Sequence, residues 1–168
     1  MSKQSLHTWK NRRSSISYWI SVGLGSGLFR PAPGTWGSFA GLLLAVLFIK
    51  NGITLFGLGI AILIVSILGS VAIDKVEKLS GIHDAPEIVI DEIAGQWIAV
   101  LPILMFAPSW IAFALAFILF RLFDIVKPWP ISWLDSQVQG GFGVMVDDIV
   151  AGIQAAFILY AMFFFQLI

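Results

Sequence analysis

The sequence predicts an all-α fold, a multi-pass membrane helical bundle of about five helices, and three observations predict it. Of 168 residues, 58% are hydrophobic and only 12% are charged, whereas typical soluble domains have about 45–50% apolar and about 25% charged residues. The mean hydropathy is +0.92. The apolar residues also form long runs without strand or helix alternation, which is typical of segments surrounded by lipid.

The amino-terminal end is basic. Residues 1–13 carry four Lys or Arg side chains, and the Ser- and Gly-rich stretch 14–28 lacks the continuous apolar core of a cleavable signal peptide. We interpret residues 1–22 as a basic arm with a helix lying in the membrane interface.

Two apolar runs follow this arm. Residues 36–49 are apolar, but 14 residues at about 1.5 Å rise fall short of a hydrocarbon core of about 30 Å. Whether this segment crosses the membrane is left open. Residues 52–73 contain no charge over 22 residues and predict the clearest span.

The remaining segments alternate between polar and apolar. They are a polar loop with a short helix at 74–87, apolar helices at 88–108 and 109–126, a Pro- and Gly-rich connection at 127–145, and a last apolar helix at 146–168. No stretch has the composition of a linker, so residues 1–168 are predicted to form a single domain.

The helix ends that carry charge are predicted to share one membrane face. Counting crossings from a cytoplasmic amino terminus puts Ile73, Ile88, Val126 and Val146 on the cytoplasmic side and leaves Lys50 as the one basic residue outside. This distribution agrees with the preference of Lys and Arg for the cytoplasmic face. Reversing the first crossing would change the absolute side but not the shared face.

Five carboxylates fall within about two helical turns of that face. An ionisable residue in a span costs about 2.5–3.5 kcal/mol, so a shared divalent cation would compensate the group. Oxygen ligands without Cys or a His cluster favour Mg²⁺ or Mn²⁺ over Zn²⁺. The alternative for any one acid is a solvated position at a helix amino terminus. The candidate catalytic residues are Asp91, Glu92, Asp124, Asp147 and Asp148.

Several other side chains are candidates for binding phosphate oxygens. Arg121, Asp124 and Lys127 are spaced by three, so a helix continuing to Pro128 would place them on one face. Ion pairs within that helix are an equally compatible interpretation. A glycine-rich loop before residue 35 and the polar loop at 74–87 supply three further candidates: Arg30, Thr35 and His83.

Charge and composition exclude some functions. The formal net charge is zero, so no basic surface of the kind that binds nucleic acid is predicted. The chain has no cysteine, which excludes thiolate nucleophiles and disulfides. A membrane ion or solute transporter subunit that uses intramembrane carboxylates stays open as an alternative.

Four separated motifs together resemble the phosphatidylglycerophosphatase A family. They are GSGLFRPAPGTWGS at 25–38, HDAPEIVIDEIAG at 83–95, FRLFDIVKPWPI at 120–131 and GGFGVMVDDIVAG at 140–152. The resemblance covers about residues 23–152.

The resemblance implies a hydrolase of phospholipid biosynthesis, a multi-pass enzyme of the bacterial cell inner membrane with its active site facing the cytoplasm. Its substrate would be the membrane lipid phosphatidylglycerophosphate and its cofactor Mg²⁺, with an oligomeric state that the motifs do not indicate. The resemblance assigns metal binding to the acids, here Glu92, Asp124, Asp147 and Asp148 together with Asp91, and puts Arg121 and Lys127 near the phosphate. Metal-assisted attack by water is then the expected chemistry.

Overall fold

The computed structural model describes residues 4–168, and in this range the protein is all-helical, as predicted. The number of α-helices is eight rather than about five, because three of them are short. The long helices are α2 (Pro33–Lys50), α3 (Leu55–Ser80), α4 (Ile90–Ala99), α6 (Trp110–Val126) and α8 (Gly140–Phe164). The short helices are α1 (Ile16–Ser21), α5 (Leu101–Met105) and α7 (Ile131–Gln137).

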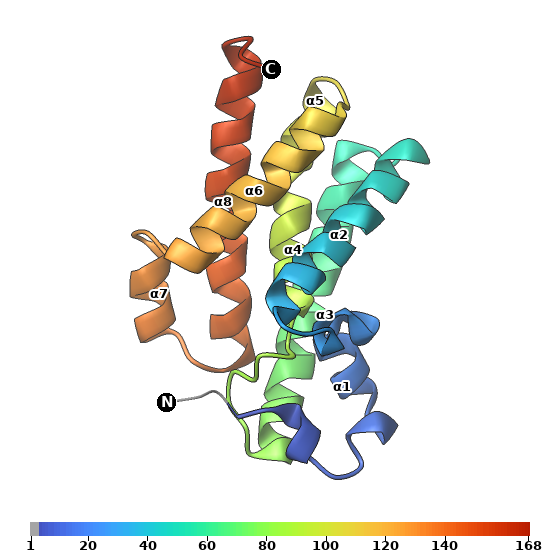
Figure 1. The fold of residues 1–168 in the computed structure, drawn as a ribbon, viewed down its shortest axis with the longest axis vertical. Helices are drawn as coiled ribbons and strands as arrows, with labels where there is room; N and C mark the ends of the chain where they lie inside the picture. Colours follow the sequence, from blue (N-terminus) through green and yellow to red (C-terminus); the bar gives the residue numbers. More distant parts are fainter. Residues whose placement is uncertain (1–3) are drawn as a thin grey trace.

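Three of these helices are long and apolar enough to cross a membrane, which indicates membrane association. They are α2 with 18 residues, α3 with 26 and α8 with 25. Helix α2 is longer than the predicted segment 36–49 because it begins at Pro33, and proline is well suited to the first helical position. Every helix of the bundle can be followed in Figure 1.

The segment 74–87, predicted to be a polar loop with a short helix, is helical over its first seven residues, but these residues continue α3 to Ser80 and do not form a separate helix. Lys and Glu are good helix formers, so the change from apolar to polar residues does not end the helix. The end comes at Gly81, whose φ of 70° is left-handed and whose N–H donates to the carbonyl oxygen of Glu77. The loop is therefore confined to residues 81–89.

Helix α4 occupies the centre of the bundle and packs against α2, α3, α6 and α8 (Figure 1). Nine of its residues are buried. Small residues permit this packing: a Cβ built on Gly41 of α2 would stand 3.1 Å from Cα of Ile93, and Nε1 of Trp97 donates to the Gly41 carbonyl at 2.9 Å. Glycine at such contacts is typical of packed membrane helices.

The described part of the predicted amino-terminal arm packs onto the bundle. Leu6, Tyr18 and Val22 are buried, and α1 lies against α3. Glu87, in the loop before α4, accepts hydrogen bonds from the Ser5 hydroxyl and from the Leu6 amide at 3.1 Å. The arm therefore contacts the loop that leads into α4, and its position relative to a membrane interface stays a prediction.

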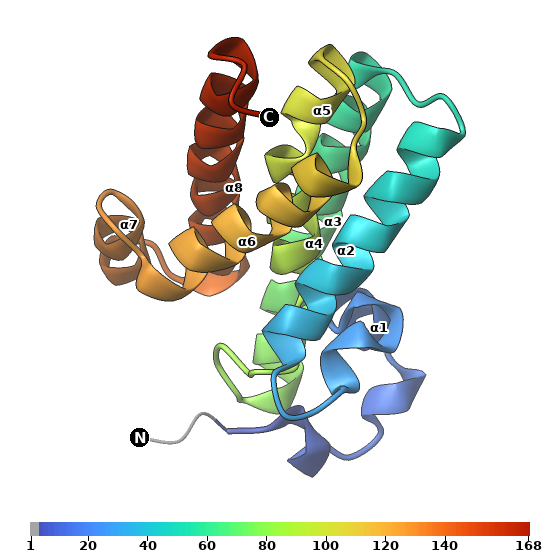
Figure 2. The same cartoon turned by 45° about the horizontal axis from the view of Figure 1, so that its top comes forward.

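Charged helix ends gather toward one end of the molecule. Helices α2, α4 and α8 begin and α3 ends in the lower half of Figure 1, whereas α2, whose last residue is Lys50, ends in the upper half. In Figure 2, α6 crosses in front of α4 toward α7, which lies beside the first part of α8. The side of a membrane that this end faces stays a prediction.

Candidate active site

A cavity of about 510 Å³ lies among the ends of α3, α4, α6 and α8, the loop 81–89 and α7. Eight of the ten acidic residues of the protein line it. They are Glu77, Asp84, Asp91, Glu92, Asp124, Asp135, Asp147 and Asp148. All five predicted catalytic acids are therefore on the wall of one cavity.

Three of these acids form a compact group that we call the acid core: Asp91, Glu92 and Asp148. One carboxylate oxygen of each lies within 4.8 Å of the others. Asp91 Oδ1, Glu92 Oε2 and Asp148 Oδ2 are buried atoms without a hydrogen-bond partner in the described residues. A shared positive charge stabilises buried carboxylates at this spacing, and the donor set fits a hard divalent cation.

Local structure explains how the acid core forms. Asp91 and Glu92 lie in the first turn of α4, where the helix dipole favours negative charge. Asp148 lies on α8, whose beginning is fixed to α3 by a hydrogen bond of 2.7 Å from the Gly141 amide to Asp74 Oδ1. A Cβ on Gly141 would collide with the Ser70 carbonyl. The glycine therefore lets α8 begin directly against α3.

Arg121 of α6 lies beside the acid core. Its Nη1 donates to Asp124 Oδ2 at 2.6 Å and to Ser38 Oγ at 3.2 Å. A Cβ built on Gly34 would collide with Glu92 Oε1 and stand 3.4 Å from Arg121 Nη1. The first turn of α2, which has no side-chain cap, is thereby held against both the acid core and the guanidinium.

The prediction that Arg121, Asp124 and Lys127 share one helix face is wrong for Lys127. Helix α6 ends at Val126, and Lys127 takes a left-handed φ of 45° before Pro128. Its Nζ donates to Asp135 Oδ1 at 2.7 Å and to Asp147 Oδ2 at 3.1 Å. Burial lowers the pKa of Lys127, but the bonds and charges of Asp135 and Asp147 prevail and raise it above its ordinary value.

The structure thus divides the five predicted metal-binding acids between two surroundings. Glu92 and Asp148 join Asp91 in the acid core. Asp124 is paired with Arg121, and Asp147 is paired with Lys127, although both line the same cavity. A metal role for Asp124 and Asp147 stays a prediction.

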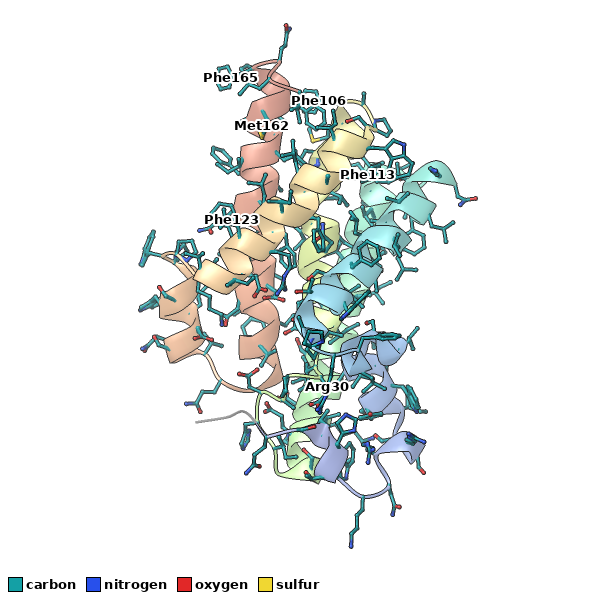
Figure 3. The ribbon with its side chains drawn as sticks, viewed as in Figure 1. Arg30, Phe106, Phe113, Phe123, Met162 and Phe165 are labelled. Carbon is teal, nitrogen blue, oxygen red and sulfur yellow. The ribbon has the colours of Figure 1, made fainter. Side chains whose placement is uncertain are left out.

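Of the other predicted phosphate-binding residues, only His83 lines the cavity. Its Nδ1 lies 3.2 Å from Glu77 Oε2, while Glu77 Oε1 accepts the Asp84 amide at 3.0 Å. Arg30 is outside the cavity, 4.0 Å from Glu87, and lies below the start of α2 in Figure 3. Thr35 is exposed and is not on the cavity wall either.

Three acidic residues of the cavity wall are not among the predicted site residues: Glu77, Asp84 and Asp135. Glu77 and Asp84 lie in the polar segment 74–87, and Asp135 lies on the seven-residue α7. The sequence feature that could identify Glu77 is its position six residues before His83, with Gly81 between them. Asp135 has no comparable pattern, because its partner Lys127 is brought to it by the turn after α6.

Comparisons with known proteins agree with the motifs. A family model described as Phosphatidylglycerophosphatase A matches residues 19–163. The chain is 40% identical over 149 residues to Phosphatidylglycerophosphatase A of Haemophilus influenzae, covering 88% of this chain and 89% of that protein. It is 38% identical over 153 residues to Phosphatidylglycerophosphatase A of Escherichia coli K12, covering 90% and 87%. No solved structure matches, and the transporter alternative has no support here.

Proposed function

We propose, because this chain belongs to the phosphatidylglycerophosphatase A family, that it hydrolyses phosphatidylglycerophosphate to phosphatidylglycerol and phosphate with Mg²⁺. The bond that breaks is the terminal phosphomonoester, and the reaction completes the synthesis of phosphatidylglycerol. The proposal covers the substrate, the metal and the place of the reaction in phospholipid biosynthesis.

The observation that carries the proposal is the group of three unpartnered carboxylate oxygens in the acid core. Asp91, Glu92 and Asp148 offer only oxygen ligands, which suit Mg²⁺. When bound there, the metal would supply Lewis-acid polarisation of the phosphoryl group and a lower pKa for bound water.

Residues beside the acid core are placed to handle the phosphate and the proton. The guanidinium of Arg121, which donates to Ser38 of α2 and lies beside Gly34, is suited to planar contact with phosphate oxygens. The free amides in the first turn of α2 add partial positive charge. One carboxylate outside the acid core, Asp124 or Asp147, accepts the proton of the attacking water.

We place the enzyme in the bacterial inner membrane with this cavity toward the cytoplasm. Lys75 and Lys78 lie near the end of α3 that borders the cavity, whereas Lys50 lies at the opposite end of α2. This asymmetry follows the preference of basic residues for the cytoplasmic side. A lipid then reaches the cavity by lateral diffusion with its acyl chains still in the bilayer.

The test is phosphate release by purified protein in mixed micelles. Phosphatidylglycerophosphate and phosphatidic acid are compared, each with Mg²⁺ and with EDTA. We expect metal-dependent release that favours phosphatidylglycerophosphate, loss of that release in Asp148→Asn, and retention in the matched variant Lys50→Gln at the far end of α2. Equal release with EDTA would refute the metal requirement, and no release from either lipid by folded protein would refute the function.

A further inference from the structure

A buried carboxylate, Glu77, contacts an exposed histidine, His83, on the wall of the cavity. Glu77 has 7% of its side chain exposed and His83 has 82%. Both Glu77 oxygens contact the loop: Oε2 lies 3.2 Å from His83 Nδ1, and Oε1 accepts the Asp84 amide. With Nδ1 engaged by Glu77, Nε2 is the ring nitrogen left for a ligand. A carboxylate that orients imidazole in this way is a common arrangement in proton transfer.

The two ends of the cavity differ in exposure, and this difference orients the substrate. Asp91 and Asp148 are 7% and 5% exposed and form the buried part of the cavity wall, here called its floor, whereas the His83 side chain on the same wall is 82% exposed. The leaving group of a lipid phosphomonoester carries the acyl chains, so it must point away from the buried floor. In-line displacement puts the attacking water on the opposite side of phosphorus, which is the floor.

His83 is also the one basic side chain of the cavity wall suited to releasing a proton. The described residues that line the cavity include two basic side chains, His83 and Lys127. Lys127 is held by Asp135 and Asp147 at 2.7 and 3.1 Å, and these contacts favour its protonated form. Arg121, beside the acid core, does not give up its proton in proteins.

We infer that His83, positioned by Glu77, is the general acid that protonates the departing glycerol oxygen. This inference rests on the proposed function. Water attacks phosphorus from the floor and gives its proton to a carboxylate. The bond from phosphorus to the glycerol oxygen breaks, and that oxygen takes a proton from His83 Nε2. The products are an alcohol and inorganic phosphate, and solvent returns a proton to His83.

Leaving-group dependence tests this role. Two substrates are compared. The first is phosphatidylglycerophosphate, whose leaving alkoxide needs a proton. The second is a diacyl lipid analogue in which the terminal phosphate is esterified to a nitrophenol group, which leaves as a stable anion and needs no proton. We expect His83→Gln to lower kcat on phosphatidylglycerophosphate by about 100-fold or more and to leave kcat on the nitrophenyl ester unchanged. Glu77→Gln should show the same selectivity to a smaller degree. The control, Lys78→Gln on the exposed side of α3, should affect neither substrate.

A second measurement uses the natural substrate alone. Added imidazole should restore hydrolysis of phosphatidylglycerophosphate by His83→Gly, because a free imidazolium can replace the missing donor. Equal losses on both substrates in His83→Gln, or no rescue of His83→Gly, would overturn the inference. Absence of activity in the wild-type protein would instead overturn the proposed function, so the two failures are distinguishable.

Discussion

Gly95 of α4 lies directly against the backbone of Asp148 of α8. A Cβ built on Gly95 would stand 2.5 Å from the Asp148 carbonyl oxygen and 2.5 Å from Cε2 of Phe120. On the next turn of α8, a Cβ on Gly152 would collide with the Gly95 carbonyl. The two helices that carry the acid core therefore touch at their backbones, and the distance between Asp148 and the α4 acids depends on this contact.

Gly95→Ala should separate α4 from α8 and reduce both stability and activity. Forcing an extra carbon into a packed contact costs about 1–3 kcal/mol. Thermal unfolding in detergent and phosphate release measure the two effects. Gly59→Ala is the matched control, because its added Cβ meets nothing within 4 Å, and it should be neutral or stabilising by about 0.5–1 kcal/mol. Equal behaviour of the two variants would contradict the close contact.

Asp148→Asn should impair metal binding more than Asp147→Asn. Asp148 belongs to the acid core, whereas Asp147 is bonded to Lys127. Loss of a residue that only orients a metal ligand costs about 10–100-fold in affinity or activity, and we expect Asp147→Asn in that range and Asp148→Asn beyond it. The measurement is the Mg²⁺ concentration for half-maximal phosphate release. If both variants raised this Mg²⁺ concentration equally, the assignment of Asp148 but not Asp147 to the acid core would be wrong.

Arg121→Gln should destabilise the protein, and Asp124→Asn added to it should restore stability without restoring activity. Both side chains of this pair are 15% exposed, and removing one member of a buried pair costs about 3–5 kcal/mol because the other charge is left alone. The double variant leaves no unpaired charge, so stability returns, but it still lacks the guanidinium that activity needs. Unfolding temperatures and phosphate release for both variants provide the check, and recovered activity in the double variant would exclude Arg121 from the site.

Glu87→Ala should release the amino-terminal arm. Ser5 and Leu6 lose the carboxylate that accepts their hydrogen bonds, so trypsin should cleave after Lys10 and Arg13 faster than in the wild-type protein. Arg30→Gln is the comparison, because its guanidinium is 69% exposed at 4.0 Å from Glu87 and such pairs contribute little. It should change neither cleavage nor KM. A raised KM would return Arg30 to the phosphate-binding residues.

The sequence predicts the fold class well because composition alone decides it: long uncharged runs such as 52–73 have few stable states other than membrane helices. It predicts the gathering of acids well too, because Asp91 lies near the start of α4, Asp124 near the end of α6 and Asp148 in the first half of α8, and these helices run in alternating directions (Figure 1). Short helices are harder to predict, since the stability of α1, α5 and α7 comes from packing with the rest of the chain rather than from their own residues.

The errors within the site have local causes. Lys127 was assigned to α6 by its spacing, although the residue before a proline is disfavoured in helical conformation. The polarity of residues 74–80 predicts a loop with a short helix that is separate from the preceding apolar helix. Charged residues extend helices readily, however, and Gly81 is the residue that ends α3. Asp135 could not be predicted as a site residue, because a contact across the turn after α6 leaves no repeating pattern in the sequence.

The collection of eight acids in one cavity has a consequence for the outer surface. The formal net charge is zero, yet of the basic residues that the structure describes only Lys127 and His83 line that cavity. Arg121 is largely buried beside the acid core, so most of the other described Lys and Arg side chains lie on the outer surface. Lys10, Arg13, Lys75 and Lys78 are exposed. Each basic residue near a membrane surface attracts anionic lipid by about 1 kcal/mol. We therefore expect a protein that is neutral by count to enrich negatively charged lipids around itself, and the proposed substrate is among the most negatively charged of them.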